Sequence, residues 1–95
     1  MKKQIGVCGV DAGLLMVGDP CYFLDGNPSA AKKVFPTWDG FCDLDIPDET
    51  GCQLNFAKGH AGLGVVVHCT HGDGCYPVYL ETTKAGRRRL IVHLD

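Results

Sequence analysis

The C-terminal part of the chain alternates apolar and polar residues with the two-residue period of a β-strand. Three such segments lie within residues 64–95, separated by two connections that contain glycine. Because side chains on a strand point alternately to opposite faces, Val65 and Val67 share one face of the first segment. We predict that residues 64–95 form three consecutive antiparallel strands of one sheet.

Turn residues mark both connections of this expected sheet. The first connection, residues 70–74, ends in Asp73-Gly74, a pair that tolerates the positive φ angles of hairpin turns. The second connection is residues 84–86. Pro77 lies in the middle segment and cannot donate a ladder hydrogen bond, so we expect an open edge or a bulge there.

The rest of the chain predicts shorter elements. Strands or extended segments are expected at residues 3–10, 14–17, 21–24, 41–46 and 53–57. The one good helix candidate covers residues 28–35, because Asn27 can cap its free amides and Pro28 suits its first position. Pro36 ends this helix.

These elements together predict an all-β fold that is mainly antiparallel. It is either a small sandwich or a partly open barrel, with one short helix near residues 28–35. The 95 residues are expected to form a single small β domain, residues 1–95. A chain of this size buries only about 60–65% of its unfolded surface, so the core is expected to be thin.

Composition and charge narrow the class of protein. The formal net charge of −2 provides no electrostatic reason to bind nucleic acid or an anionic membrane. Lys2 and Lys3 precede an apolar run, as in a signal peptide, but Asp11 interrupts it and no small-residue cleavage pattern follows. No apolar stretch is long enough to span a bilayer. We therefore expect a cytoplasmic rather than a secreted protein, with no nucleic-acid or membrane partner.

Cysteine is abundant in this chain. Six cysteines occur, at positions 8, 21, 42, 52, 69 and 75, and no C-x-x-C pair is present. In an exported protein they would suggest a disulfide framework. In the cytoplasm thiols stay reduced, and free cysteine commonly behaves as a small buried apolar residue.

A candidate zinc site comprises Cys69, His71 and Cys75. The first two share one face of a strand, and Cys75 returns across the turn. A structural zinc site needs four tetrahedral nitrogen or sulfur ligands, so another segment would have to supply one more. The available residues are Cys8, Cys21 and His60. The alternative is a buried Cys69 beside a solvent-facing His71 at a hairpin tip.

Cys69 and Cys75 are also candidates for a cross-strand disulfide. They face each other within bridging distance if residues 70–74 form a five-residue loop. If the last two of these residues alone make the turn, Cys69 lies opposite Val78 and no bridge forms.

Three turn aspartates, Asp11, Asp19 and Asp73, are candidate ligand-binding residues, and His68 is a fourth candidate. Carboxylates gathered at one end of a β-sandwich can bind a cation such as Ca²⁺ through their oxygens. The alternative is that each carboxylate accepts hydrogen bonds from the amides of its own turn.

Thiol chemistry is a further alternative. A small hydrolase or thiol enzyme needs a cysteine beside an imidazole that can take its proton. Cys21 and Cys75 are the candidates because turns expose them, but no catalytic motif surrounds either residue.

Charges of opposite sign are concentrated in two segments. Residues 84–89 carry four basic side chains, and residues 39–49 are acidic. A surface of this kind can support association with a partner or a second copy. The alternative is that the charged hairpin is a solvated edge that discourages sheet-to-sheet aggregation.

The segment Gly72–Tyr79 reads Gly-Asp-Gly-Cys-Tyr-Pro-Val-Tyr and is followed by a short turn and an apolar strand ending in Asp95. It resembles the C-terminal part of a bacterial family of unknown function, whose members often close in this way. An early Gly-x-Leu followed by Asp-Pro, another feature of that family, is matched by Gly13–Leu15 and Asp19-Pro20. The resemblance covers about a third of the chain. It implies a β-rich fold and no known chemistry.

We therefore expect a small non-enzymatic binding or interaction module whose partner is a protein or a small molecule. Self-association into a homo-oligomer is expected because the core is thin and the strand edge at Pro77 is open. A metal-binding protein, with Zn²⁺ or Ca²⁺ as cofactor, and a thiol-dependent hydrolase are the alternatives.

Overall fold

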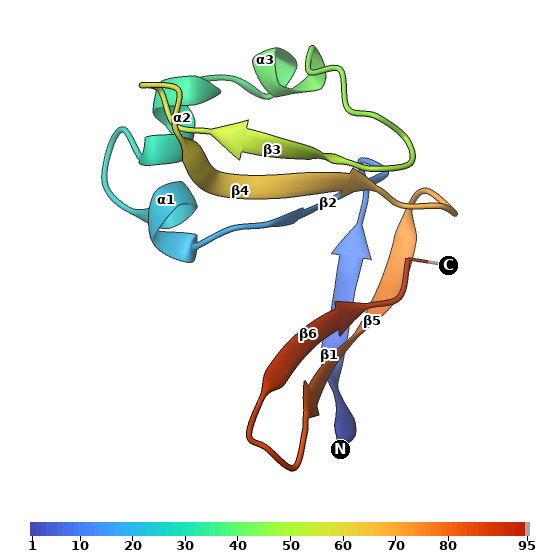
Figure 1. Ribbon diagram of the computed structural model, residues 1–95. Coiled ribbons are helices and arrows are strands. Elements are labelled where there is room, and N and C mark those ends of the chain that lie inside the picture. The colour runs from blue at the N-terminus through green and yellow to red at the C-terminus, as the bar shows by residue number, and fades with distance from the viewer. Residues whose placement is uncertain (95) are drawn as a thin grey trace. The chain divides into compact units, whose positions relative to one another are not determined.

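The computed structural model describes residues 1–94, in which six strands and three short helices occur (Figure 1). Strands make up 41% of the chain and helices 16%. The paired strands form two three-stranded sheets, and neither sheet closes into a barrel within the described residues. The predicted all-β, mainly antiparallel class is therefore confirmed.

The chain divides into two compact units. Unit 1 combines residues 1–14 with the C-terminal segment that starts at Cys69. Unit 2 is the intervening segment, Leu15–His68. Each unit contains its own sheet, so each is described separately.

The sheet of unit 1 has the strand order β1-β5-β6. Its strands are β1 (Lys2–Val10), β5 (Gly74–Thr82) and β6 (Arg88–Val92). Both pairings are antiparallel, and a β-bulge interrupts β1 before Gly6. Tyr76 and Val78, on the same face of β5, are buried, as their two-residue spacing requires.

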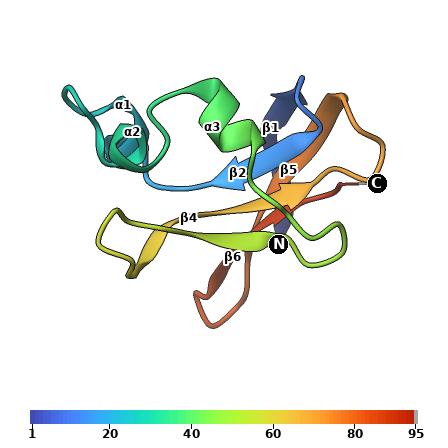
Figure 2. The ribbon, with the colours of Figure 1, turned by 90° about the horizontal axis from the view of Figure 1, so that it is seen from above.

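The sheet of unit 2 has the strand order β2-β4-β3. Its strands are β2 (Leu14–Val17), β4 (Ala61–His68) and β3 (Cys52–Asn55). Leu63 and Val66 on the central strand β4 have 0% and 1% of their surface exposed, so they form the centre of this core. The view from above shows β2, β4 and β3 side by side (Figure 2).

The three helices all belong to unit 2, and each has five residues. They are α1 (Pro20–Leu24), α2 (Ala30–Val34) and α3 (Trp38–Cys42). None of the helices in residues 1–94 has the length and apolar character needed to cross a membrane. Helix α2 lies within the predicted range 28–35, but the hydroxyl of Ser29, and not Asn27, caps it by accepting from the amide of Lys32 at 3.3 Å.

Two segments expected to be extended are helical at least in part. Residues 21–24 belong to α1, because Asp19 caps this helix and Pro20 occupies its first position. Residues 41–42 of the strand expected at 41–46 end α3, which Thr37 caps by accepting from the amide of Gly40 at 3.1 Å. Both errors come from reading apolar residues as strand where a capping residue starts a helical turn.

The prediction that residues 64–95 form one three-stranded sheet is wrong. The three strands are present, but β4 pairs within unit 2 whereas β5 and β6 pair with β1. The connection after β4 is not a hairpin: the amide of Cys69 donates to the carbonyl of Gly13 at 2.9 Å, and Gly72 donates to Cys69 at 3.0 Å. Alternation determines which side chains share a face of a strand, but it does not determine the neighbouring strand.

Pro77 explains where β6 ends. The last β5–β6 pair is Val78 with Val92, so the next pair would join Pro77 to His93. The amide of His93 donates to the carbonyl of Pro77 at 3.3 Å, but Pro77 has no N–H to return a bond. In the described part of the chain, β5 pairs with β1 alone from Pro77 back to Gly74, which agrees with the open edge expected at this proline.

Candidate functional site

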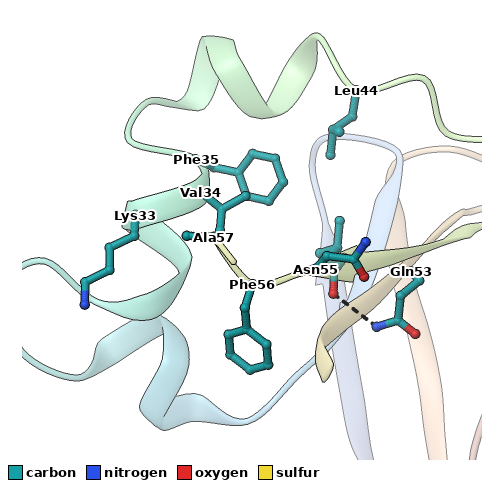
Figure 3. Close-up of a pocket in the computed structure, with 9 residues that line it drawn as sticks. Lys33, Val34, Phe35, Leu44, Gln53, Asn55, Phe56 and Ala57 are labelled. Carbon is teal, nitrogen blue, oxygen red and sulfur yellow. Dashed lines mark hydrogen bonds between the residues drawn. The ribbon is translucent and has the colours of Figure 1, made fainter. Parts of the chain in front are cut away.

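Unit 2 contains a pocket of about 460 Å³ at the end of α2 and along β3 (Figure 3). Three segments line it: Lys33–Phe35 at the end of α2, Leu44 after α3, and residues 53–57 of β3 and the turn that follows. Figure 3 shows Phe35 and Leu44 on the helical side and Gln53 and Asn55 on the strand side. Segments distant in the sequence therefore supply opposite walls.

The pocket lies at the outer edge of the sheet of unit 2. Successive residues of a strand point to opposite faces, yet Gln53, Leu54 and Asn55 all line the pocket. Three consecutive residues can do so only where the edge of the strand forms the wall. Strand β3 is the last strand of its sheet, with β4 on one side and no strand on the other in the described residues.

Aromatic contacts hold the two phenylalanines of the pocket in place. Phe35 packs edge-to-face on Phe41 with ring centres 5.1 Å apart, and Phe41 stacks on Trp38 at 5.6 Å. Phe56 packs edge-to-face on Tyr22 at 5.0 Å. Because such pairs stabilise a fixed ring geometry, both rings are in position before any ligand arrives.

Polar groups surround this apolar wall. The Nε2 group of Gln53 donates to the carbonyl oxygens of Leu54 at 3.0 Å and Gly64 at 2.9 Å. Both of its donor hydrogens are thus engaged, and its Oε1 remains to accept a hydrogen bond. Lys33 provides the cation among the lining residues, and Asn55 provides a second amide.

The candidate zinc ligands are not brought together. Within residues 1–94 no three His, Cys, Asp or Glu side chains are arranged to hold a metal ion. Cys75 lies on β5 opposite Gly9, whereas Cys69 is buried before the connection and His71 is exposed within it. All six cysteines are free, so Cys69 and Cys75 form no disulfide.

Cys69 has a structural environment. Its thiol contacts the Tyr76 hydroxyl, and that hydroxyl donates to the carbonyl of Gly72 at 2.6 Å. Burial raises the pKa of the Cys69 thiol, the contact with Tyr76 opposes this, and the charge of Asp73 adds to the increase. A thiol that stays protonated is a poor nucleophile and a poor metal ligand.

Cys21, the exposed candidate nucleophile, lies at the start of α1. The pKa of its thiol is raised, chiefly by a hydrogen bond to the Asp19 carboxylate and then by burial and by the charges of Asp19 and Asp25. Asp19 itself caps the helix by accepting from the amide of Cys21 at 3.0 Å. Asp19 thus stabilises a local turn and keeps the neighbouring thiol protonated, which opposes thiolate chemistry.

The other candidate ligand-binding residues are not among the residues that line the pocket. His68 Nε2 lies 2.9 Å from the carbonyl oxygen of Ile46 and 3.4 Å from Asp48 Oδ1. This imidazole therefore holds the end of the acidic segment 39–49, which we call the acidic loop, against β4. Asp11 and Asp73 are exposed and flank the pair of Val10 with Gly74 at one end of the unit 1 sheet.

The residues of the pocket were not identified from the sequence. A usable signal was present, because six of the eight aromatic residues lie between Tyr22 and Phe56. Such a concentration in a segment of short elements indicates an aromatic cluster. It does not indicate that Phe35 and Phe56 would line a hollow, since this depends on the distance between α2 and β3.

Comparison with family models, with curated protein sequences and with solved structures finds no match to this chain. The resemblance to a bacterial family of unknown function therefore stays a prediction.

Proposed function

We propose that this chain is a small non-enzymatic binding module and that its ligand occupies the pocket beside β3. The observation that carries the proposal is an open hollow whose walls offer both apolar side chains and polar groups. Ligand pockets commonly have volumes of about 300–1,000 Å³ and apolar walls with a few polar groups. The volume of this pocket, about 460 Å³, lies within that range.

The lining indicates a small organic acid with an aromatic or branched aliphatic body. Phe35, Leu44 and Phe56 offer apolar contact to the body of such a ligand. Lys33 is the cation among the lining residues, and its amine, which points away from the other labelled side chains in Figure 3, would turn toward the carboxylate of the ligand. Because Lys33 is exposed, this ion pair is expected to add only about 0.2–1 kcal/mol. The apolar contact therefore supplies most of the affinity.

We further propose that the protein functions in a reducing compartment, the cytoplasm, and that it belongs to the bacterial family that its C-terminal segment resembles. The six free thiols support the first statement. Metal binding and thiol catalysis are not proposed, because no observed cluster of ligands favours the first and the raised pKa of Cys21 opposes the second.

Titration followed by NMR amide shifts tests the proposal, with 3-phenylpropionate as the probe and 3-phenylpropanamide as its uncharged analogue. We expect saturable shifts in residues 33–35, 44 and 53–57 with both probes. Lys33→Gln should weaken binding of the acid about two- to fivefold and leave the amide unaffected. Lys32→Gln is the matched control, because Lys32 is on the same helix but does not line the pocket.

Two results would contradict the proposal. One is the absence of saturable shifts with either probe. The other is a set of shifts that cluster away from α2 and β3 and do not change in Lys33→Gln.

A further inference from the structure

Among residues 1–94, strand β1 presents the longest free edge of unit 1. It is the first strand in the order β1-β5-β6 and has nine residues. Along it Ile5 and Val7 have 57% and 61% of their surface exposed. A long exposed apolar edge strand pairs readily with another strand unless it is protected.

The position of Pro77 shows which backbone groups of β1 face outward. The carbonyl of Pro77 accepts from His93 on the β6 side, and the N–H and C=O of one strand residue point to the same side. Val7, which is opposite Pro77, therefore does not exchange hydrogen bonds with it. The N–H and C=O of Val7 point to the free edge, and so do those of Gly9, two residues further on.

Only the first half of this edge is protected. Lys2 and Lys3 place charges at its start, and the bulge before Gly6 distorts the strand. Both are features by which natural edge strands avoid pairing. The remaining segment, Gly6–Val10, contains no charge, no proline and no bulge.

We infer that the partner of this segment is a second copy of the chain, paired antiparallel about a two-fold axis with Val7 of each copy opposite Gly9 of the other. In such a pair, the outward N–H and C=O groups of Val7 in one copy bond to the outward C=O and N–H groups of Gly9 in the other. The two-fold axis repeats this pair once. The strand begins with lysines and is followed by Asp11. Antiparallel pairing brings the start of each strand, which carries Lys2 and Lys3, to the end of the other copy's strand, which Asp11 follows.

Charge thus favours a second copy in the antiparallel direction. Parallel pairing would set the lysines of the two copies side by side, whereas antiparallel pairing places them at opposite ends. A stable interface usually buries about 800 Å² on each partner, more than a five-residue edge provides. The dimer is therefore weak and dissociates on dilution. It does not depend on the pocket beside β3.

Sedimentation velocity tests this inference. The protein concentration is varied from about 10 μM to about 1 mM, because an interface smaller than the standard size is expected to have a dissociation constant in this range. The wild-type chain should shift from monomer to dimer, and added salt should weaken the dimer. Val7→Pro removes the N–H that points to the free edge and leaves every hydrogen bond between β1 and β5 in place. This variant should therefore fold and remain monomeric. Cys8→Pro, which removes an inward N–H, should unfold.

Two further variants make the test specific. Val7→Lys adds a charge to the edge without altering the backbone, so it should also be monomeric even if Val7→Pro does not fold. Leu90→Lys is the matched control, because Leu90 is 56% exposed on β6, and it should dimerise like the wild type. The inference is overturned if the wild type stays monomeric at the highest concentration, or if Val7→Lys dimerises as the wild type does.

Discussion

Gly51 is a residue of unit 2 that both its backbone conformation and its surroundings constrain. Its φ is +66°, and a Cβ atom placed on it would lie 2.4 Å from the carbonyl oxygen of Val66. Its amide donates to the carbonyl of Pro47 at 3.1 Å, which turns the chain from the acidic loop into β3. Both the positive φ and the approach to β4 require glycine at this position.

Gly51→Ala is expected to reduce the free energy of unfolding by about 2–4 kcal/mol, because it combines an unfavourable φ with a backbone clash. Urea denaturation measures this change. Gly26→Ala is the control, since Gly26 has a φ of +50° but nothing within 4 Å of an added Cβ, and it should cost about 1–2 kcal/mol. Equal losses in the two variants would show that the approach to Val66 is not a constraint.

At the scale of elements, the β5–β6 hairpin carries a cross-strand ion pair. Arg89 donates to the Glu81 carboxylate, and the two residues are opposite each other in the register. The hydrogen bond from Arg89 lowers the pKa of Glu81 below its ordinary value of 4.5, although burial of the carboxylate opposes this. Glu81 is mostly covered, whereas Arg89 is exposed, so the pair is open to solvent on one side.

This ion pair predicts a particular pH dependence of stability. Because the pKa of Glu81 is lower in the folded state, the pair stabilises the fold above pH 4.5, and its contribution is lost as the pH falls through the folded-state pKa. The melting temperature of Glu81→Gln should lie below that of the wild type at neutral pH, and the difference should vanish in acid. Glu49→Gln, at an exposed position outside the sheets, is the control and should follow the wild-type profile. A difference that persists in acid would argue against the ion pair.

At the scale of the whole molecule, the chain builds two sheets with separate sets of buried residues. It leaves unit 1 after Leu14, forms unit 2, and returns to unit 1 at Cys69. The middle strand of each sheet contributes two buried residues, Leu63 and Val66 in β4 and Tyr76 and Val78 in β5, and the edge strands β1 and β3 contribute Val10 and Leu54. Because the neighbour of β1 in its sheet is β5, β1 can pair only after the C-terminal third of the chain is available.

The burial of Leu63 predicts a large effect of a small substitution. Leu63→Ala removes a side chain that is 0% exposed and should destabilise the protein by about 2–5 kcal/mol. Val65→Ala, on the same strand but at a position 43% exposed, should cost about 0.5 kcal/mol or less. Chemical denaturation of both variants measures the difference, and similar costs would place the core of unit 2 elsewhere.

The predictions from sequence were accurate for strands with strong alternation and inaccurate for short apolar runs. Strands were expected at residues 3–10 and 14–17, and β1 and β2 lie there. Residues 21–24 were expected to be extended, but the cap at Asp19 makes them helical. Over five residues one capping hydrogen bond outweighs the weak preference that a few apolar side chains express.

The candidate site was less accessible to sequence reasoning than the fold class. Cys69, His71 and Cys75 are close in the chain, and proximity in the chain suggested a shared site. The pocket instead combines Phe35, Leu44 and residues 53–57, which become neighbours only when α2 packs beside β3. No local pattern in the sequence encodes that distance.

The sequence alone determined the β class, the positions of β1 and β2, the open edge at Pro77 and which side chains share a face of a strand, because these depend on the two-residue period and on proline chemistry. The tertiary structure alone decided which strands are neighbours, that β4 and β5 belong to different sheets, and where a pocket forms. The physical reason is that alternation acts along one strand, whereas pairing depends on the burial and hydrogen bonding that distant segments achieve together.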